Sequence, residues 1–163
     1  MRLTATLLSL AVILPTKLEV ATRASSEGSI RGAWSVISTS LTGADRTSTN
    51  DSPQPGLVLF TERHYSVMFV EGIEPRKPFA DAQRATDAGK ITAYDTFTGH
   101  TGTYSIVDSV IAMRVVVAKL PNLMTGELST TFMRFAHRIS GDTLRMTRWT
   151  PRGAFTMLLV RAK

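Results

Sequence analysis

Short runs of β-forming residues, each ended by a turn, follow one another along nearly all of this chain after residue 29. Two of the turns, Asp108-Ser109 and Gly141-Asp142, are two-residue links of the kind that join neighbouring antiparallel strands. The pattern predicts eight strands in consecutive hairpin order, at residues 30–40, 57–61, 65–70, 101–107, 110–118, 127–140, 143–149 and 154–161. An even number of such strands can close on itself and remove its exposed edges. We therefore expect an all-β fold, an eight-stranded up-and-down antiparallel barrel, whose interior can hold one small ligand.

Two segments interrupt this rhythm. Residues 42–56 are rich in Ser, Thr, Asp, Asn and Pro, which form turns and loops. Within residues 71–99, Pro75 and Pro78 exclude a regular strand. Residues 81–97 contain enough Ala, Gln, Arg, Lys and Asp for a short helix, interrupted at Gly89. We expect the first segment to be a loop and the second a short helical insertion, placed as a lid or at the side of the barrel.

The beginning of the chain has the pattern of a targeting segment. Met1-Arg2 gives a positive start, an apolar run follows at residues 3–14, and small residues lie before a cut after Ala24. We interpret residues 1–24 as a signal peptide, or else as an N-terminal helix that plugs one end of the barrel. We expect residues 25–163 to form the barrel domain, and no other segment is apolar enough to span a membrane. The expected location is periplasmic or secreted, and otherwise cytoplasmic.

Composition excludes several classes of site. The chain has no cysteine, which rules out disulfides, thiolate metal sites and a cysteine nucleophile. Its net charge is +6, but Lys and Arg are spread along the sequence, so we expect solvated strand faces and no nucleic-acid partner. A basic rim around a cavity mouth would favour an anionic ligand. No feature of the sequence defines an oligomeric state.

Alternation along the strands places aromatic and methionine side chains on the inward face. Tyr65 and Phe69 share one face, and Arg134 and Arg138 mark the solvent side of a neighbouring strand. Methionine adapts to irregular shapes, which suits a cavity for apolar ligands. The predicted ligand-binding residues are Tyr65, Phe69, Tyr104, Met113, Phe135 and His137.

The same alternation assigns the remaining walls of the barrel. It places Ile106 and Val117 inward, and it places Arg114 outward, away from any carboxylate ligand in the lumen. Further inward residues are Leu144, Met146, Phe155, Met157 and Leu159. Apolar inward faces are also what a packed core requires, so an interior without a usable cavity is the alternative.

Five short motifs occur in order and together resemble one known family. They are Gly32-x-Trp34, PGLVLFT at residues 55–61, HYSVM at residues 64–68, Gly102-Thr103-Tyr104, and SGDTL at residues 140–144. Through them the chain resembles the bacterial lipocalin-like domain family, from Gly32 to about Arg161. The resemblance implies a calycin-type barrel of eight strands, in a family that carries no agreed catalytic residues to transfer.

Closure of such a barrel has a geometric consequence. The last strand runs antiparallel beside the first, so Arg161 is predicted to lie near Trp34. A guanidinium over the indole face contributes roughly 0.5–2 kcal/mol. We therefore interpret Gly32, Trp34 and Arg161 as structural residues that seal one end, and expect any ligand away from this base, around Tyr65, Tyr104 and His137.

Three functions are compatible with the sequence. The preferred one is a binding protein that holds a small apolar or amphipathic ligand in the lumen and uses no cofactor. The second is an enzyme of the cyclase or isomerase type, with His137 or Tyr104 transferring a proton in the same lumen. The third is a filled barrel that acts as an interaction module through an exposed apolar patch. No catalytic motif is present, His137 is the one catalytic candidate, and the three histidines lack the spacing of a metal site.

Overall fold

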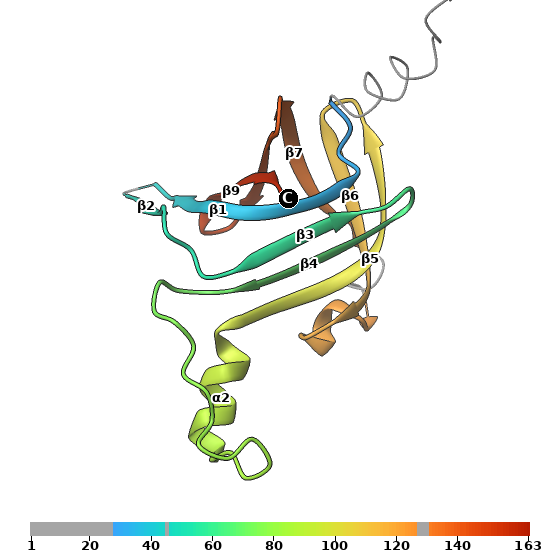
Figure 1. Cartoon of the computed structure of the whole chain (residues 1–163). Coiled ribbons are helices and arrows are strands. Elements are labelled where there is room, and N and C mark those ends of the chain that lie inside the picture. The colour runs from blue at the N-terminus through green and yellow to red at the C-terminus, as the bar shows by residue number, and fades with distance from the viewer. Residues whose placement is uncertain (1–27, 45, 127–130) are drawn as a thin grey trace, which may run out of the picture.

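The structure is a computed structural model that describes residues 28–44, 46–126 and 131–163, and its main body is a closed antiparallel barrel (Figure 1). Each barrel strand pairs with the next, and the last returns to the first. The eight barrel strands are β1 (Gly32–Thr42), β3 (Gly56–Phe60), β4 (His64–Val70), β5 (Phe97–Val107), β6 (Val110–Ala118), β7 (Met133–Ser140), β8 (Thr143–Thr150) and β9 (Gly153–Arg161). The predicted fold class is confirmed. The interpretation of residues 1–24 lies outside the described residues.

A ninth strand, β2 (Thr47–Asn50), lies in the segment that was expected to be a loop. β1 is longer than β3, and only its first residues, Gly32–Ser35, pair with that strand. β2 pairs with residues 39–42 at the far end of β1, so it supplies partners for backbone groups that β3 does not reach. The sequence marks the turn residues around β2 correctly, but the need for this strand comes from the unequal lengths of its neighbours.

The segment between β4 and β5 leaves the barrel as an arm, which carries the helix α2 (Asp87–Asp95) (Figure 1). The helix begins later than predicted, because Asp81 accepts a hydrogen bond from the backbone of Gln83 in a turn and Thr86 caps the helix. Gly89 does not interrupt it, since the Gly89 N–H donates to the Thr86 side chain. The arm projects away from the barrel, which makes it a side insertion and not a lid. Of the helices in the described residues, none is long and apolar enough to cross a membrane.

The centre of the barrel is packed with apolar side chains from nearly every strand. Seven of them have no exposed surface: Trp34, Val58, Ile111, Met113, Leu144, Met146 and Leu159. A side chain with no exposed surface has no water-sized space against it, so these residues form a filled layer across the barrel. Each contributes roughly 1.5–3 kcal/mol through its burial. The layer separates two ends: the base, where β1 begins and β9 ends, and the mouth, where β1 ends and β9 begins.

Strict alternation of inward and outward side chains fails in β6, because a bulge changes which residues face inward. Val115 is buried, but Val116 and Val117 are both exposed, so the prediction that Val117 points inward is wrong. The register shifts there, because Gly102 of β5 lies opposite Val115 while Thr101 lies opposite Val117. A Cβ atom at Gly102 would overlap the carbonyl oxygen of Arg114, so the bulge needs glycine at this position. Ile106, also predicted inward, is 40% exposed near the end of β5.

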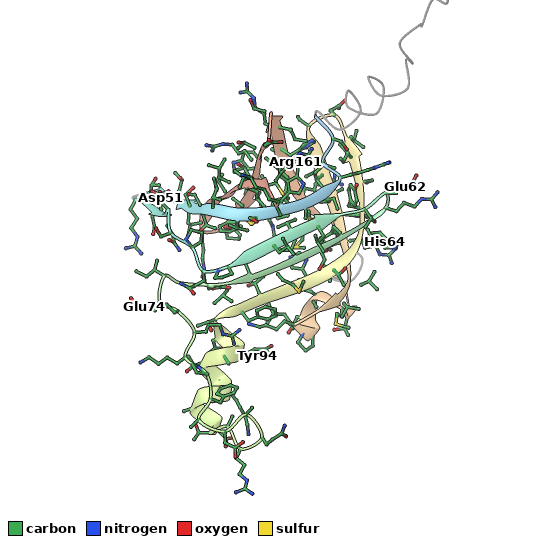
Figure 2. All side chains as sticks on the ribbon, in the orientation of Figure 1. Asp51, Glu62, His64, Glu74, Tyr94 and Arg161 are labelled. Atoms are coloured by element: carbon green, nitrogen blue, oxygen red, sulfur yellow. The ribbon has the colours of Figure 1, made fainter. Side chains whose placement is uncertain are left out.

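Trp34 and Arg161 lie directly opposite each other across the β1–β9 pair, as predicted. The Arg161 guanidinium carbon lies 4.4 Å from the centroid of the Trp34 ring. The same guanidinium donates to the carbonyl oxygens of Arg31 and Ser29 at 3.1 and 2.7 Å. Its Nε lies 3.4 Å from the Asp142 carboxylate, in the turn before β8. Figure 2 labels Arg161 among the side chains of the barrel. One side chain therefore ties β9 to β1, to the chain that precedes β1 and to the β7–β8 turn.

Gly32 leaves space for this contact, and a hydrogen bond holds the Trp34 ring in place. Gly32 has a φ of +121°, and a Cβ atom there would lie 3.2 Å from the Arg161 guanidinium. The Trp34 indole N–H donates to the carbonyl oxygen of Ile30 at 2.7 Å, so its one polar atom is satisfied within the core. The assignment of Gly32, Trp34 and Arg161 to barrel closure is consistent with each of these contacts.

Replacing Arg161 by glutamine is expected to lower the free energy of unfolding by about 2–3 kcal/mol, because the cation–π contact, the carbonyl hydrogen bonds and the ion pair are all lost. Urea unfolding followed by fluorescence measures the change. The matched control is Arg63→Gln, which removes an exposed arginine from the β3–β4 turn and should change stability by no more than about 0.5 kcal/mol. An equal loss in the two variants would contradict the role of Arg161.

Candidate functional site

The six residues predicted to bind a ligand lie at three levels of the barrel and do not line one cavity. Tyr65, Met113 and Phe135 belong to the packed core, where none is more than 5% exposed. Phe69 lines a hollow at the mouth. Tyr104 and His137 line a second hollow at the base. The candidate binding space is therefore divided between the two ends.

The base hollow has a volume of about 410 Å³ and brings Tyr104 and His137 together with Arg31 and Glu62. Tyr104 packs edge-on against Phe60, with ring centroids 5.1 Å apart, and its hydroxyl is held by the backbone of the β3–β4 turn. Burial raises the pKa of Tyr104, and the nearby Arg31 guanidinium opposes that shift. The expectation that Tyr104 and His137 lie away from the Trp34 end is wrong, because β5 and β7 both end where β1 begins.

The His137 ring has one buried nitrogen without a partner. Its Nδ1 makes no hydrogen bond with any of the residues that the structure describes. The His137 backbone N–H donates to the Ser109 carbonyl oxygen at 2.7 Å, which fixes this part of β7 against the β5–β6 turn. The groups considered for proton transfer, His137 and Tyr104, do share the base hollow.

The mouth hollow has a volume of about 350 Å³ and an apolar inner wall. Val36, Phe69 and Phe155 contribute that wall from β1, β4 and β9. Its rim is polar: the side chains of Asn50 and Gln54 donate to carbonyl oxygens at the start of the arm, at 3.3 and 2.6 Å. The hollow can accept the apolar part of a ligand and offers polar groups where that part meets solvent.

Beside this hollow the structure places an arginine that the sequence-based prediction missed. Arg148 lies on the same face of β8 as the buried Leu144 and Met146, and is itself half-buried. Its Cα partner is Phe155, and its guanidinium lies 3.3 Å from the sulfur of Met133 on β7. The alternation that identified Leu144 and Met146 also points to residue 148. By contrast Arg114, which the sequence placed outward, is exposed.

A histidine and a tyrosine complete a polar cluster inside the barrel, which we call the lumen cluster: Tyr65, His100 and Arg148. His100 lies opposite the buried Val67, so it shares the inward face. Its Nδ1 lies 3.1 Å from the Tyr65 hydroxyl oxygen. Burial, with the positive charge of Arg148 as a second cause, lowers the pKa of His100 to about 4, and burial raises the pKa of Tyr65. At neutral pH the lumen cluster therefore holds one positive charge, on Arg148.

Nothing in the described part of the chain neutralises this charge. Ion pairs between described side chains involve Arg84, Lys90 and Arg161, and no described carboxylate lies within ion-pair distance of Arg148. The described residues also contain no group of three acidic or histidine side chains that could hold a metal ion. The chemistry offered by the lumen cluster is that of an anion site.

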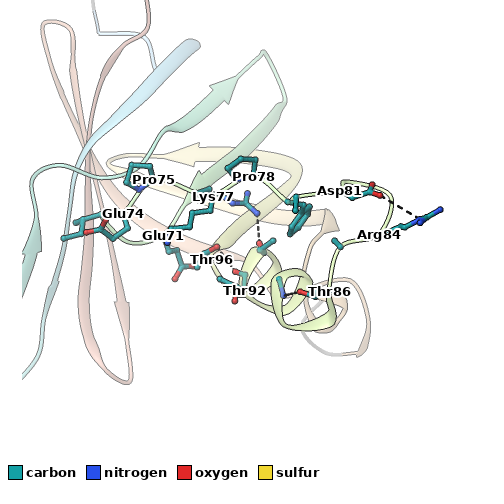
Figure 3. A pocket seen from close by; sticks show the side chains of 17 residues that line it. Glu71, Glu74, Pro75, Lys77, Pro78, Asp81, Arg84, Thr86, Thr92 and Thr96 are labelled. Atoms are coloured by element: carbon teal, nitrogen blue, oxygen red, sulfur yellow. Dashed lines mark hydrogen bonds and ion pairs between the residues drawn. The ribbon is translucent and has the colours of Figure 1, made fainter.

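A third and larger hollow, of about 590 Å³, lies in the arm and outside the barrel (Figure 3). It forms between α2 and the chain before it, where the Arg76 guanidinium donates to the Ala93 carbonyl oxygen at 2.9 Å. Lys119 fastens the arm to the end of β6: its ammonium group donates to the carbonyl oxygens of Tyr94 and Phe97 and lies 4.1 Å from the Tyr94 ring centroid. A short 3-10 helix, η1 (Pro121–Leu123), follows Lys119. This hollow shares no residue with the lumen cluster.

Comparisons with known proteins bear on the barrel as a whole. The sequence model of the lipocalin-like domain matches residues 31–156 of the chain. An uncharacterized protein from Bacteroides eggerthii DSM 20697, known from a crystal structure, is similar at 11% identity and a TM-score of 0.42, over 81% of this chain and 98% of that chain. No curated protein matches. The matched range includes Trp34, His100 and Arg148.

The lumen cluster predicts a pH dependence of stability. The pKa of His100 is about 4 in the folded protein and 6.5 in a model peptide, so between these values the unfolded chain binds more protons. The stabilisation is fully present above pH 6.5 and falls by roughly 2–3 kcal/mol as the pH drops toward 4. His100→Gln should remove this part of the dependence of the unfolding free energy on pH. Urea unfolding at several pH values between 4 and 6.5 measures it. The control His64→Gln, at an exposed position in β4, should keep the wild-type slope, and a shared change would refute the assignment.

Proposed function

Because the chain belongs to the lipocalin-like domain family, we propose that it binds a small amphipathic anion at the mouth of its barrel. The lipocalin-like barrel is a fold that suggests ligand binding in general. In this proposal the acidic group of the ligand pairs with Arg148, and the apolar part lies against Phe69 and Phe155. The packed layer between the base and the mouth limits the ligand to the mouth side of the lumen.

The observation that carries the proposal is the charge of Arg148 inside the barrel with no described carboxylate beside it. A partly desolvated charge without a partner is costly, and proteins normally pair such groups. A carboxylate or phosphate on a ligand would form charge-assisted hydrogen bonds with the guanidinium and offset that cost. A cationic ligand would be repelled, so the lumen cluster favours an anion.

The apolar half of the site adjoins the guanidinium. Phe155 is the Cα partner of Arg148, and it also lines the mouth hollow together with Phe69 and Val36. A volume of about 350 Å³ lies at the lower end of the range of small-molecule pockets, which fits a short alkyl chain or a single ring system. An apolar wall next to one half-buried cation therefore supports an amphipathic ligand over a wholly polar one.

His100 adds a neutral polar group to the same site. Its lowered pKa keeps the ring uncharged at neutral pH, so it does not compete with Arg148 for the anion. The Tyr65 hydroxyl contacts Nδ1, which leaves Nε2 as the second hydrogen-bonding group of the lumen cluster. We propose that this nitrogen orients the acidic group of the ligand.

Octanoate and octanol test the proposal, because they share an alkyl chain and differ in charge. Titration calorimetry should show that the wild-type protein binds octanoate more tightly than octanol. Arg148→Gln should weaken octanoate binding by about tenfold or more and leave octanol binding nearly unchanged.

The matched control is Arg145→Gln, which removes a positive charge from the same strand at an exposed position. It should bind both compounds like the wild type. An octanoate affinity that is the same in wild type and Arg148→Gln, or wild-type protein that does not bind octanoate, would overturn the assignment of the anion to Arg148.

A further inference from the structure

The outer wall formed by β6, β7 and β8 carries arginines and no carboxylates. Residues 110–163 contain nine Lys and Arg but only two acidic residues, Glu127 and Asp142. Asp142 is paired with Arg161 at the base. The expectation that basic residues are evenly spread therefore does not hold for the folded chain. We call this wall the arginine face; it consists of Arg114, Arg134, Arg138 and Arg145, with Phe132 and Trp149 at its mouth end.

Two of these arginines are placed against each other. Arg138 and Arg145 are direct Cα partners on β7 and β8, and both are exposed. Like charges directly opposite each other destabilise a strand pair. None of the four arginines is in an ion pair with another described residue. Fold stability does not account for this arrangement, whereas an anionic partner would remove the repulsion.

The mouth end of the arginine face carries uncovered apolar side chains. Trp149 is 69% exposed on β8, and Phe132, just before β7, is 42% exposed. Phe132 precedes the buried Met133, so it lies on the outward side with Arg134. Tryptophan and phenylalanine beside cationic residues are typical of surfaces that lie at the interface of a lipid bilayer.

We propose that the arginine face docks on an anionic lipid bilayer. The arginines would contact headgroup phosphates, which attract basic residues to a negatively charged surface. Trp149 and Phe132 would enter the interface. Single-stranded nucleic-acid sites combine a groove with successive stacking aromatic side chains. The arginine face is instead the convex outside of a barrel with its aromatic residues at one end, which favours a bilayer.

Docking in this way also places the mouth near the lipid. β8 ends at Thr150, on the side of the barrel that holds the mouth hollow, and Trp149 is the residue before it. Amphipathic anions partition into bilayers, so a docked barrel would meet its ligand at this surface. That last step rests on the proposed function, but the docking itself does not.

Vesicle co-sedimentation with the full chain tests the docking in the absence of octanoate. Wild-type protein should bind vesicles of phosphatidylcholine with phosphatidylglycerol and bind pure phosphatidylcholine vesicles much more weakly. The double variant Arg138→Gln/Arg145→Gln should bind the anionic vesicles at least about tenfold more weakly than the wild type. Trp149→Ala should also weaken binding and remove the blue shift of tryptophan fluorescence that the vesicles produce, since Trp34 is fully buried.

The matched control is Arg46→Gln/Arg63→Gln, which removes two exposed charges outside the arginine face. Its net charge is therefore the same as that of the Arg138→Gln/Arg145→Gln variant. It should bind vesicles like the wild type, as should Arg148→Gln, so that a failure of docking and a failure of ligand binding can be told apart. Equal binding by the two double variants would overturn the proposal. So would binding of a single-stranded oligonucleotide that depends on Arg138 and Arg145 while anionic vesicles are not bound.

Discussion

The pairing of β1 with β9 closes the barrel, with Arg161 lying over Trp34 at its end, and the other features of the structure depend on that closure. It brings the last strand to the first, so that β1 and β9 are no longer open edges. Closure also defines an inside and an outside for every strand. Only then does a side chain on β8 become either part of the lumen or part of the outer wall. The filled layer, of which Trp34 is a member, completes the separation between base and mouth.

Sequence alternation predicts which face a residue occupies, because that depends on local backbone geometry alone. It correctly placed Leu144 and Met146 inward and Arg114 outward. It could not predict how far along the barrel a residue lies, because that depends on the register between strands. For this reason Tyr104 and His137 were expected far from Trp34, and in the structure they line a hollow beside it.

The remaining errors also come from contacts between strands. Val117 points outward because a bulge in β6 passes Gly102 of β5, and the spacing within β6 contains no sign of it. β2 forms because β1 extends beyond the end of β3, and only the pairing between β1 and β3 shows this difference in length. Arg148 is different: the period of two that marked Leu144 and Met146 continues to it, so its inward position was available in the sequence. The inward face of β8 is recognised in the sequence by its apolar residues, and an arginine does not belong to that pattern.

β8 carries one arginine on each face of the barrel wall. Arg145 and Arg148 are three residues apart, an odd number, so alternation sends them to opposite faces of the barrel wall. Arg145 is exposed and lies opposite another arginine, Arg138, and no described carboxylate pairs with it. Arg148 is half-buried on the inward face, and its Cα partner is Phe155. The same residue type therefore lies outside the barrel at residue 145 and inside it at residue 148, because the closed wall turns the two faces of one strand into two different surroundings.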